Sequence, residues 1–302
     1  MRRLTIIVAV LATLYSAYWV IGSRAVKNAA QTQVVLLRED GWAVDYDSLK
    51  VQGFPSRFDT SLTELALTSP DGAITYAVPM VQALALSYRP NDVILAFPDQ
   101  QDVTVDGVPF TATSPDLRAR LALQDTTALA LETLTAEATT VVIADTAGSV
   151  LTFRDMLAAV RAAGPLPNTY DLYANVADIS FAPALMALLR DNSALPASIA
   201  IINVDATVTL DRAINRHTLP KWQDEPGRLR GLTIKTLEMT WGDLTISGDG
   251  ALQVDAEGRA EGTVTFTAND WRRMLDIAQM AGLIAPEFQF LARSIGEKLS
   301  GV

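Results

Sequence analysis

Long stretches in which polar and apolar residues alternate limit the folds open to this chain more than any other feature. In the clearest one, Ile202–Leu210, every second residue is aliphatic and the residues between are asparagine, aspartate or threonine. A period of two gives a β-strand one apolar face and one polar face. Residues 232–241 alternate too, with a change of phase at Thr236 that predicts a β-bulge. These stretches predict an antiparallel sheet with one wet face.

Most of the remaining chain follows the strand pattern. Further strands are predicted over residues 58–68, 74–78, 82–88, 93–97, 102–105, 117–123, 128–136, 140–145, 170–180, 244–247, 252–255 and 262–267. Turn residues separate several of them: Asp71-Gly72, Asp106-Gly107 and Ala256–Arg259 favour turns, and Gly248-Asp249-Gly250 also predicts a turn rather than a nucleotide-binding loop. The result is a chain dominated by short connections between strands.

Helices are predicted in only a few places beyond the N-terminus. The expected segments are Phe153–Ala163, residues 183–190, Trp271–Ala281 after an N-cap at Asp270, and Pro286–Leu299. The predicted fold class is therefore α+β, mainly antiparallel β: an N-terminal transmembrane helix, then an elongated β-rich domain with a few short helices, two of them at the C-terminus.

The N-terminus carries the pattern of a membrane anchor. Arg2 and Arg3 precede Leu4–Ile21, which holds no charged residue. Eighteen helical residues extend about 27 Å, just enough to cross a hydrocarbon core of about 30 Å. Tyr18 and Trp19 fall at the far end, where aromatic rings favour the membrane–water boundary. These four residues mark the predicted limits of the anchor.

Two arginines on the near side favour a cytoplasmic N-terminus, although Arg24 and Lys27 on the far side weaken that tendency. A cleaved secretory signal is the alternative, but bulky residues occupy 18–21, where a cleavage site needs small ones. The predicted organisation is an anchor over residues 1–24 in the inner membrane and a periplasmic domain over 25–302. Two β-rich halves meeting near 164–170 would also fit.

Composition excludes several classes of protein. The chain has no cysteine, so it has no disulfide, no thiolate metal site and no cysteine nucleophile. Its formal net charge of −10 argues against nucleic-acid binding, which needs a cationic surface. The 49% of hydrophobic residues is enough for a substantial core.

No residue is predicted to be catalytic. His217 is the only histidine, and the neighbouring sequence indicates an exposed loop rather than a metal ligand or a triad member. The chain has no nucleophile elbow, no phosphate-binding loop and no dinucleotide fingerprint. We therefore predict no cofactor, no metal and no enzymatic activity.

A basic stretch around one tryptophan is the candidate contact surface. Five basic residues face only two acidic ones between positions 212 and 230. The candidate residues are Arg212, Arg216, Lys221, Trp222, Arg228 and Arg230. Cations around an aromatic ring suit anionic headgroups or an acidic partner. The alternative is a long hairpin loop whose charges pair with neighbouring acids.

Several short motifs, spread over nearly the whole chain, resemble one bacterial envelope family, domain-of-unknown-function family 2125. They are Tyr15–Trp19, Gly53–Phe58, Leu86–Asn91, Trp241–Leu244, Gly248–Gly250, Asp255–Arg259 and Glu261-Gly262. The resemblance implies an exported, membrane-anchored protein without assigned functional residues. The glycine-rich hairpins of the C-terminal half are also loosely similar to AsmA-type envelope proteins, which are associated with lipid handling.

Two functions are compatible with these observations. An open amphipathic sheet would bind lipid or another apolar envelope ligand, whereas a closed one would only enclose a core. Alternation is the same for an open and a closed sheet, so the sequence does not decide between them. Binding of lipid or another apolar ligand is the predicted function, and a structural or assembly partner of another envelope protein is the alternative.

Overall fold

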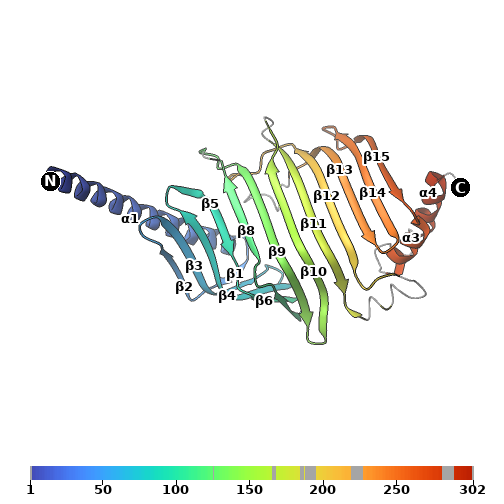
Figure 1. Cartoon of the computed structure of the whole chain (residues 1–302), viewed down its shortest axis with the longest axis horizontal. Coiled ribbons are helices and arrows are strands. Elements are labelled where there is room, and N and C mark those ends of the chain that lie inside the picture. The colour runs from blue at the N-terminus through green and yellow to red at the C-terminus, as the bar shows by residue number, and fades with distance from the viewer. Residues whose placement is uncertain are drawn as a thin grey trace. The chain divides into compact units, whose positions relative to one another are not determined.

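A computed structural model describes residues 2–124, 126–164, 168–183, 187, 195–218, 227–280 and 289–300. In these ranges fifteen strands form a large antiparallel sheet, together with an N-terminal helix and two C-terminal helices (Figure 1). The predicted fold class is confirmed. The chain divides into unit 1 (residues 1–139 and 215–217) and unit 2 (residues 140–214 and 218–302), which are described separately.

Unit 1 contains helix α1 and the first strands. The elements are α1 (Arg2–Glu39), β1 (Ala43–Asp45), β2 (Ser48–Gln52), β3 (Arg57–Thr68), β4 (Ile74–Leu86), β5 (Arg89–Ala96), β6 (Gln100–Val105), β7 (Val108–Thr113), β8 (Arg118–Leu123) and the first part of β9 (Leu131–Asp145). The main path of pairing is β1-β3-β4-β5-β8-β9. In addition, β2 pairs with β3, β6 with β4 and β7, and β7 with β9.

Helix α1 is longer than the apolar segment that predicted it. Its first turns project away from the strands of unit 1, contacts with the sheet begin at Tyr15, and the C-terminal half lies against β1, β2 and β3 (Figure 1). In the described part of the chain, α1 is the one helix long and apolar enough to cross a membrane, and none of its apolar window is buried in the protein. The second half buries one apolar residue, Val34.

Unit 2 is a meander in which neighbours in sequence are neighbours in space. Its elements are β10 (Gly148–Ala162), β11 (Thr169–Phe181), β12 (Ile199–Leu210), β13 (Leu229–Trp241), β14 (Leu244–Val254), β15 (Ala260–Ala268), α3 (Trp271–Met280) and α4 (Gln289–Ser300). The strands pair in the order β10 to β15. The two C-terminal helices are confirmed within the described residues, as is the bulge near Thr236, where the β13–β14 register shifts between Ile234 and Leu237.

Two local predictions are wrong. Phe153–Ala163 is not a helix but most of β10, which pairs with β11 despite its many good helix formers. Gly248-Asp249-Gly250 is not a turn but the middle of β14. The ring of Phe266 lies over Gly248, where a Cβ would come within 2.8 Å of it. Gly250 has φ +147 and would bring a Cβ within 2.3 Å of the Thr263 carbonyl, so β14 and β15 need glycine to approach this closely.

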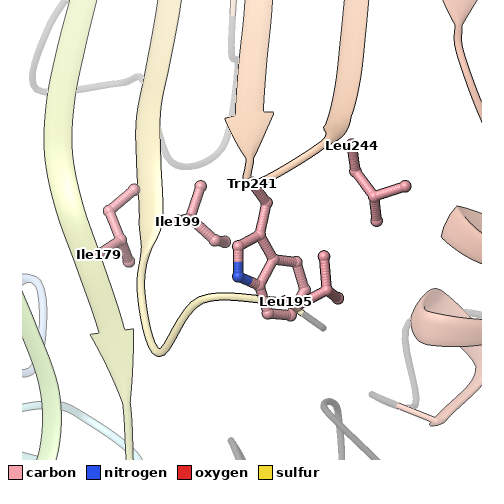
Figure 2. Close-up of a cluster of buried hydrophobic side chains, with 5 residues drawn as sticks. All are labelled: Ile179, Leu195, Ile199, Trp241 and Leu244. Atoms are coloured by element: carbon pink, nitrogen blue, oxygen red, sulfur yellow. The ribbon is translucent and has the colours of Figure 1, made fainter. Parts of the chain in front are cut away.

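A small cluster of buried hydrophobic side chains lies at one end of the strands of unit 2. Ile179, Leu195, Ile199, Trp241 and Leu244 form this cluster. Figure 2 shows the Trp241 ring pointing toward Leu195, with Ile199 on one side and Leu244 on the other. The indole Nε1 of Trp241 donates a hydrogen bond to the Pro196 carbonyl at 3.0 Å, so the one polar atom of the ring is satisfied.

The polar face of unit 2 carries an ionic network across four strands. Asp171 of β11 accepts hydrogen bonds from Thr207 at 2.8 Å, from Lys235 at 3.1 Å and from Arg161 at 3.1 Å. Lys235 also lies 3.3 Å from Asp205. The hydrogen bond from Thr207, followed by the one from Lys235, lowers the pKa of Asp171 to about 2.

This network predicts a pH-dependent stability. Since the folded pKa of Asp171 lies below its unfolded value of about 3.9, the unfolded chain binds the proton more tightly. The stabilisation is therefore present above about pH 4 and is lost as the pH falls through about 2. We expect Asp171→Asn to lower the free energy of unfolding by about 1 kcal/mol at pH 7, because solvent screens the partly exposed pairs.

Denaturant unfolding of the wild type and Asp171→Asn at pH 7 and at decreasing pH down to 2 measures this difference. The control is Asp249→Asn, whose carboxylate forms no ion pair among the described residues. A stability difference for Asp171→Asn that stays constant from pH 7 to pH 2 would contradict the assignment.

Candidate functional site

Five aromatic side chains meet where α1 reaches the sheet of unit 1. We call this group the aromatic junction: Tyr15, Tyr18, Trp19, Phe54 and Phe58. Trp19 packs edge-on against Phe54, with ring centroids 5.4 Å apart, and lies 6.1 Å from Phe58. Phe58 is only 3% exposed, so it is the centre of the group, and such ring pairs add stability beyond their buried area.

Polar contacts set the position of the helix on the junction. The buried Ser87 receives two tyrosines: its carbonyl accepts a hydrogen bond from the Tyr18 hydroxyl, and its Oγ lies 3.1 Å from the Tyr15 hydroxyl. The indole of Trp19 donates to the Arg57 carbonyl at 2.8 Å. These bonds are directional, so together with the ring contacts they hold one rotation of α1 against the strands.

The backbone around Phe58 is shaped to admit the helix. Gly22 of α1 faces the Phe58 ring, and a Cβ there would come within 2.5 Å of Cζ. Gly53 has φ +100 at the corner that leads into β3, a backbone conformation that favours glycine. The Arg57 amide closes that corner by donating to the Gly53 carbonyl at 2.8 Å.

A row of apolar residues crosses unit 1 from the aromatic junction. In strand register, Phe58 lies opposite Ala85, which is followed across the sheet by Val93, Leu121 and Leu134. Exposure rises along the row, from the buried Phe58 to Leu134 at 39%. The apolar face of this unit therefore begins at the end of the membrane segment and becomes more accessible away from it.

Unit 2 has an apolar face of its own, formed by parallel rows across six strands. One row runs Ala158, Ala174, Val204, Leu237, Gly248 and Phe266. The next runs Val160, Leu172, Ala206, Ile234, Gly250 and Val264. Most of these side chains are only half-buried, and Phe266 is 60% exposed.

The structure places the basic candidate residues in different surroundings. Arg212 and Arg228 lie around Asp211 of unit 2: the Arg212 Nε is 3.3 Å from its carboxylate, and the backbone amide of Arg228 donates to it at 2.9 Å. Both contacts hold the pKa of Asp211 below its usual range, and the hydrogen bond from the Arg228 amide has the larger effect. The guanidinium of Arg230 donates to the Asp255 carbonyl at 2.5 Å.

Arg216 belongs to unit 1, where its amide donates to the Ala128 carbonyl and its Nε to His217 Nε2 at 3.2 Å. His217 is exposed in a turn, which confirms that prediction. Lys221 and Trp222 lie outside the described residues. The role of the basic stretch as a contact surface thus stays a prediction. The pairing of Arg212 and Arg228 with Asp211 agrees with the alternative, a loop whose charges pair with neighbouring acids.

The described residues hold no group of three or more histidine, aspartate or glutamate side chains arranged for a metal ion. Arg2 and Arg3 lie in the first turn of α1, and Tyr18 and Trp19 lie at the aromatic junction. Tyr18 and Trp19, which were predicted to mark the far limit of the anchor, therefore also contact the sheet.

Comparison with known proteins identifies the family. The model of the family described as an uncharacterized protein conserved in bacteria (DUF2125) matches residues 19–300. The chain belongs to this family. No curated protein and no solved structure matches the chain. The resemblance stated from short motifs is confirmed, whereas the loose similarity to AsmA-type proteins is not shown.

The family match begins at Trp19, so the junction lies at the start of the matched region. Three of the motifs that carried the resemblance, around residues 15–19, 53–58 and 86–91, meet at the junction. Sequence reasoning missed Phe54, Phe58 and Ser87 as partners of the helix. The signal was present in those motifs, but nothing in the sequence said that they are neighbours in space.

Proposed function

We propose that this member of the DUF2125 family is a non-enzymatic, membrane-anchored protein that binds lipid acyl chains on the apolar face of its sheet. In this proposal α1 crosses the inner membrane once, and the sheet lies in the periplasm. The observation that carries the proposal is the set of apolar rows that cross unit 2 with most of their side chains only half-buried.

The energetic argument starts from the size of this face. Six strands contribute apolar side chains to the two rows, and among these side chains only that of Ala206 is fully buried. In the described part of unit 2, Met274 and Ile277 of α3 pack against the cluster near Trp241. Covering apolar area is worth about 25 cal/mol per Å², so an apolar chain that lies along the rows gains substantially. Large exposed apolar patches commonly mark binding surfaces.

The anchor supports a lipid rather than a soluble ligand. The apolar row of unit 1 starts at Phe58, beside the aromatic side chains that favour the membrane–water boundary. A lipid that leaves the bilayer next to α1 would meet an apolar surface at once. Assembly with another envelope protein is the competing function and is one outcome of the test below.

The test places a photoreactive side chain on each face of β15. Phe266 and Thr265 are neighbours in sequence, and both are exposed, but they point to opposite faces of the strand. We expect Phe266→benzoylphenylalanine, expressed in intact cells and purified from carbonate-washed membranes, to give adducts with the mass of a phospholipid. Thr265→benzoylphenylalanine is the matched control and should give none.

The possible outcomes separate the two functions. A phospholipid adduct at 266 alone supports the proposal. A protein adduct at 266 in place of lipid indicates an assembly surface and overturns lipid binding. No adduct at 266, or equal lipid adducts at both positions, also overturns it, because the apolar face would then have no preference for lipid.

A further inference from the structure

A basic hollow lies between α1 and β2 of unit 1, apart from the apolar face. Ser23, Arg24 and Lys27 line it from the helix, and Leu49, Lys50, Val51 and Gln52 line it from the strand. Its volume is about 270 Å³, much larger than the roughly 30 Å³ that one water occupies in the liquid. It is therefore large enough to admit a polar group with some of its hydration.

The charge of the hollow is of one sign. Three cations line it, and no acidic residue does, although the chain as a whole has a net charge of −10. Arg24, Lys27 and Lys50 make no ion pair or side-chain hydrogen bond within the described part of the chain. The carboxylate nearest in register, Asp59 opposite Gln52, is already bound by Arg57 at 2.9 Å. Three cations that line one hollow without acidic partners among the described residues favour an anion.

The remaining lining residues suit a phosphate oxygen. The amide of Gln52 can donate hydrogen bonds beside the three charges, whereas the Ser23 hydroxyl already donates to the Val20 carbonyl at 3.1 Å. Phosphate accepts charge-assisted hydrogen bonds from lysine and arginine, which are stronger than neutral ones. The apolar parts of Leu49 and Val51 form the rest of the wall.

The distance along α1 places the hollow at headgroup depth. Arg24 and Lys27 follow Ile21, the last residue of the uncharged run, by three and six residues. At a rise of 1.5 Å per residue they lie about 4.5 and about 9 Å beyond it along the axis. A headgroup layer is roughly 5–8 Å thick on each side of the hydrocarbon core, so the backbone of Arg24 lies within it and that of Lys27 lies just beyond its outer edge, from where the long side chain can reach back. Lys50 lines the same hollow from the sheet.

We propose that this hollow binds the phosphate of an anionic phospholipid headgroup in the leaflet that α1 leaves. The inference rests on the anchoring part of the proposed function but not on lipid binding by the sheet face. It differs from general attraction between juxtamembrane cations and a membrane, because it needs Lys50 from β2 as much as Lys27 from α1. The positive-inside tendency disfavours Arg24 and Lys27 at this position, and headgroup binding gives them a role there.

The test uses the full-length protein in a neutral detergent and counts bound lipids by native mass spectrometry. The probes are phosphatidylglycerol, phosphatidylcholine with the same acyl chains, and inorganic phosphate. We expect one phosphatidylglycerol to be retained in preference to phosphatidylcholine. Lys27→Gln and Lys50→Gln should each weaken its retention about fivefold, as expected for one cation close to an anionic lipid.

The matched control is Arg89→Gln. Arg89 is an exposed cation two residues after Ser87, at the same end of unit 1, but it does not line the hollow. An equal loss with Arg89→Gln would overturn the proposal in favour of general surface charge. Retention that Lys50→Gln leaves unchanged, or that inorganic phosphate abolishes at equal concentration, would also overturn it, the latter in favour of a free-phosphate site.

The result is separable from the test of the sheet face. Lipid adducts at position 266 together with unchanged retention in Lys50→Gln would overturn the headgroup site alone. Retention that depends on Lys50, without adducts at 266, would support the headgroup site and overturn lipid binding by the sheet face alone.

Discussion

Replacing Phe58 by alanine is expected to destabilise unit 1 by about 3–5 kcal/mol and to release α1 from the sheet. Phe58 is 3% exposed and contacts Tyr18, Trp19 and Gly22, so its removal leaves a cavity in contact with three helix positions. Deleting a buried aromatic ring costs this much because the surrounding structure collapses only in part. Release of the helix follows, since Tyr18 and Trp19 lose their common packing partner.

Hydrogen exchange of the full-length protein in detergent, read by mass spectrometry, measures this effect directly. The amides of residues 24–39 and of β3 should exchange faster in Phe58→Ala, while those of β12–β14 in unit 2 should not change. Phe54→Ala is the control, because Phe54 contacts Trp19 but is 56% exposed. Equal effects of the two variants would show that Phe58 is not the centre of the junction.

Trp241→Ala is expected to have an effect of similar size in unit 2. Trp241 is 3% exposed in the cluster that closes one end of the strands, and it also binds the Pro196 carbonyl. Removing the ring should lower the free energy of unfolding of this unit by about 3–5 kcal/mol. The Pro196 carbonyl would in addition lose the hydrogen bond from the indole.

Trp241→Phe separates the two contributions. It keeps most of the apolar contact and removes the indole Nε1, so we expect a loss nearer to about 1 kcal/mol. Denaturant unfolding, followed by exchange protection of β12, β13 and β14, gives both values. If Trp241→Ala leaves this protection unchanged, the unit does not depend on the cluster of Figure 2.

Two strands of unit 2 show how much of the fold could be predicted from the sequence. The alternation of Ile202–Leu210 predicted a strand correctly, because side-chain period two is a local property. Phe153–Ala163 was predicted to be a helix that ends at Gly164-Pro165, and its leucine, alanine and arginine residues do favour helices. Pairing with β11 overrides that preference, and Asp155, with φ +49, interrupts the alternation that would have revealed the strand.

In the candidate site, too, the sequence revealed only residues that are close together along the chain. The basic residues 212–230 were visible because they are close in sequence, yet Arg216 and Arg212 belong to different units. The aromatic junction was not predicted, because its parts come from three separate stretches of the chain. Lys50 gave no signal as a partner of Arg24 and Lys27, since only the packing of β2 on α1 brings it to them.

The sequence by itself determined the apolar N-terminal segment, the dominance of strands, several of the turns and the two-faced character of the sheet. Each of these depends on composition or on a local period, which neighbouring residues set among themselves. The tertiary structure alone decided that Phe58 and Ser87 receive the helix, that Lys50 completes a basic hollow, and that the rows around Val204 and Leu237 stay half-exposed. Those outcomes depend on strand register and on contacts between distant segments, which a local pattern does not specify.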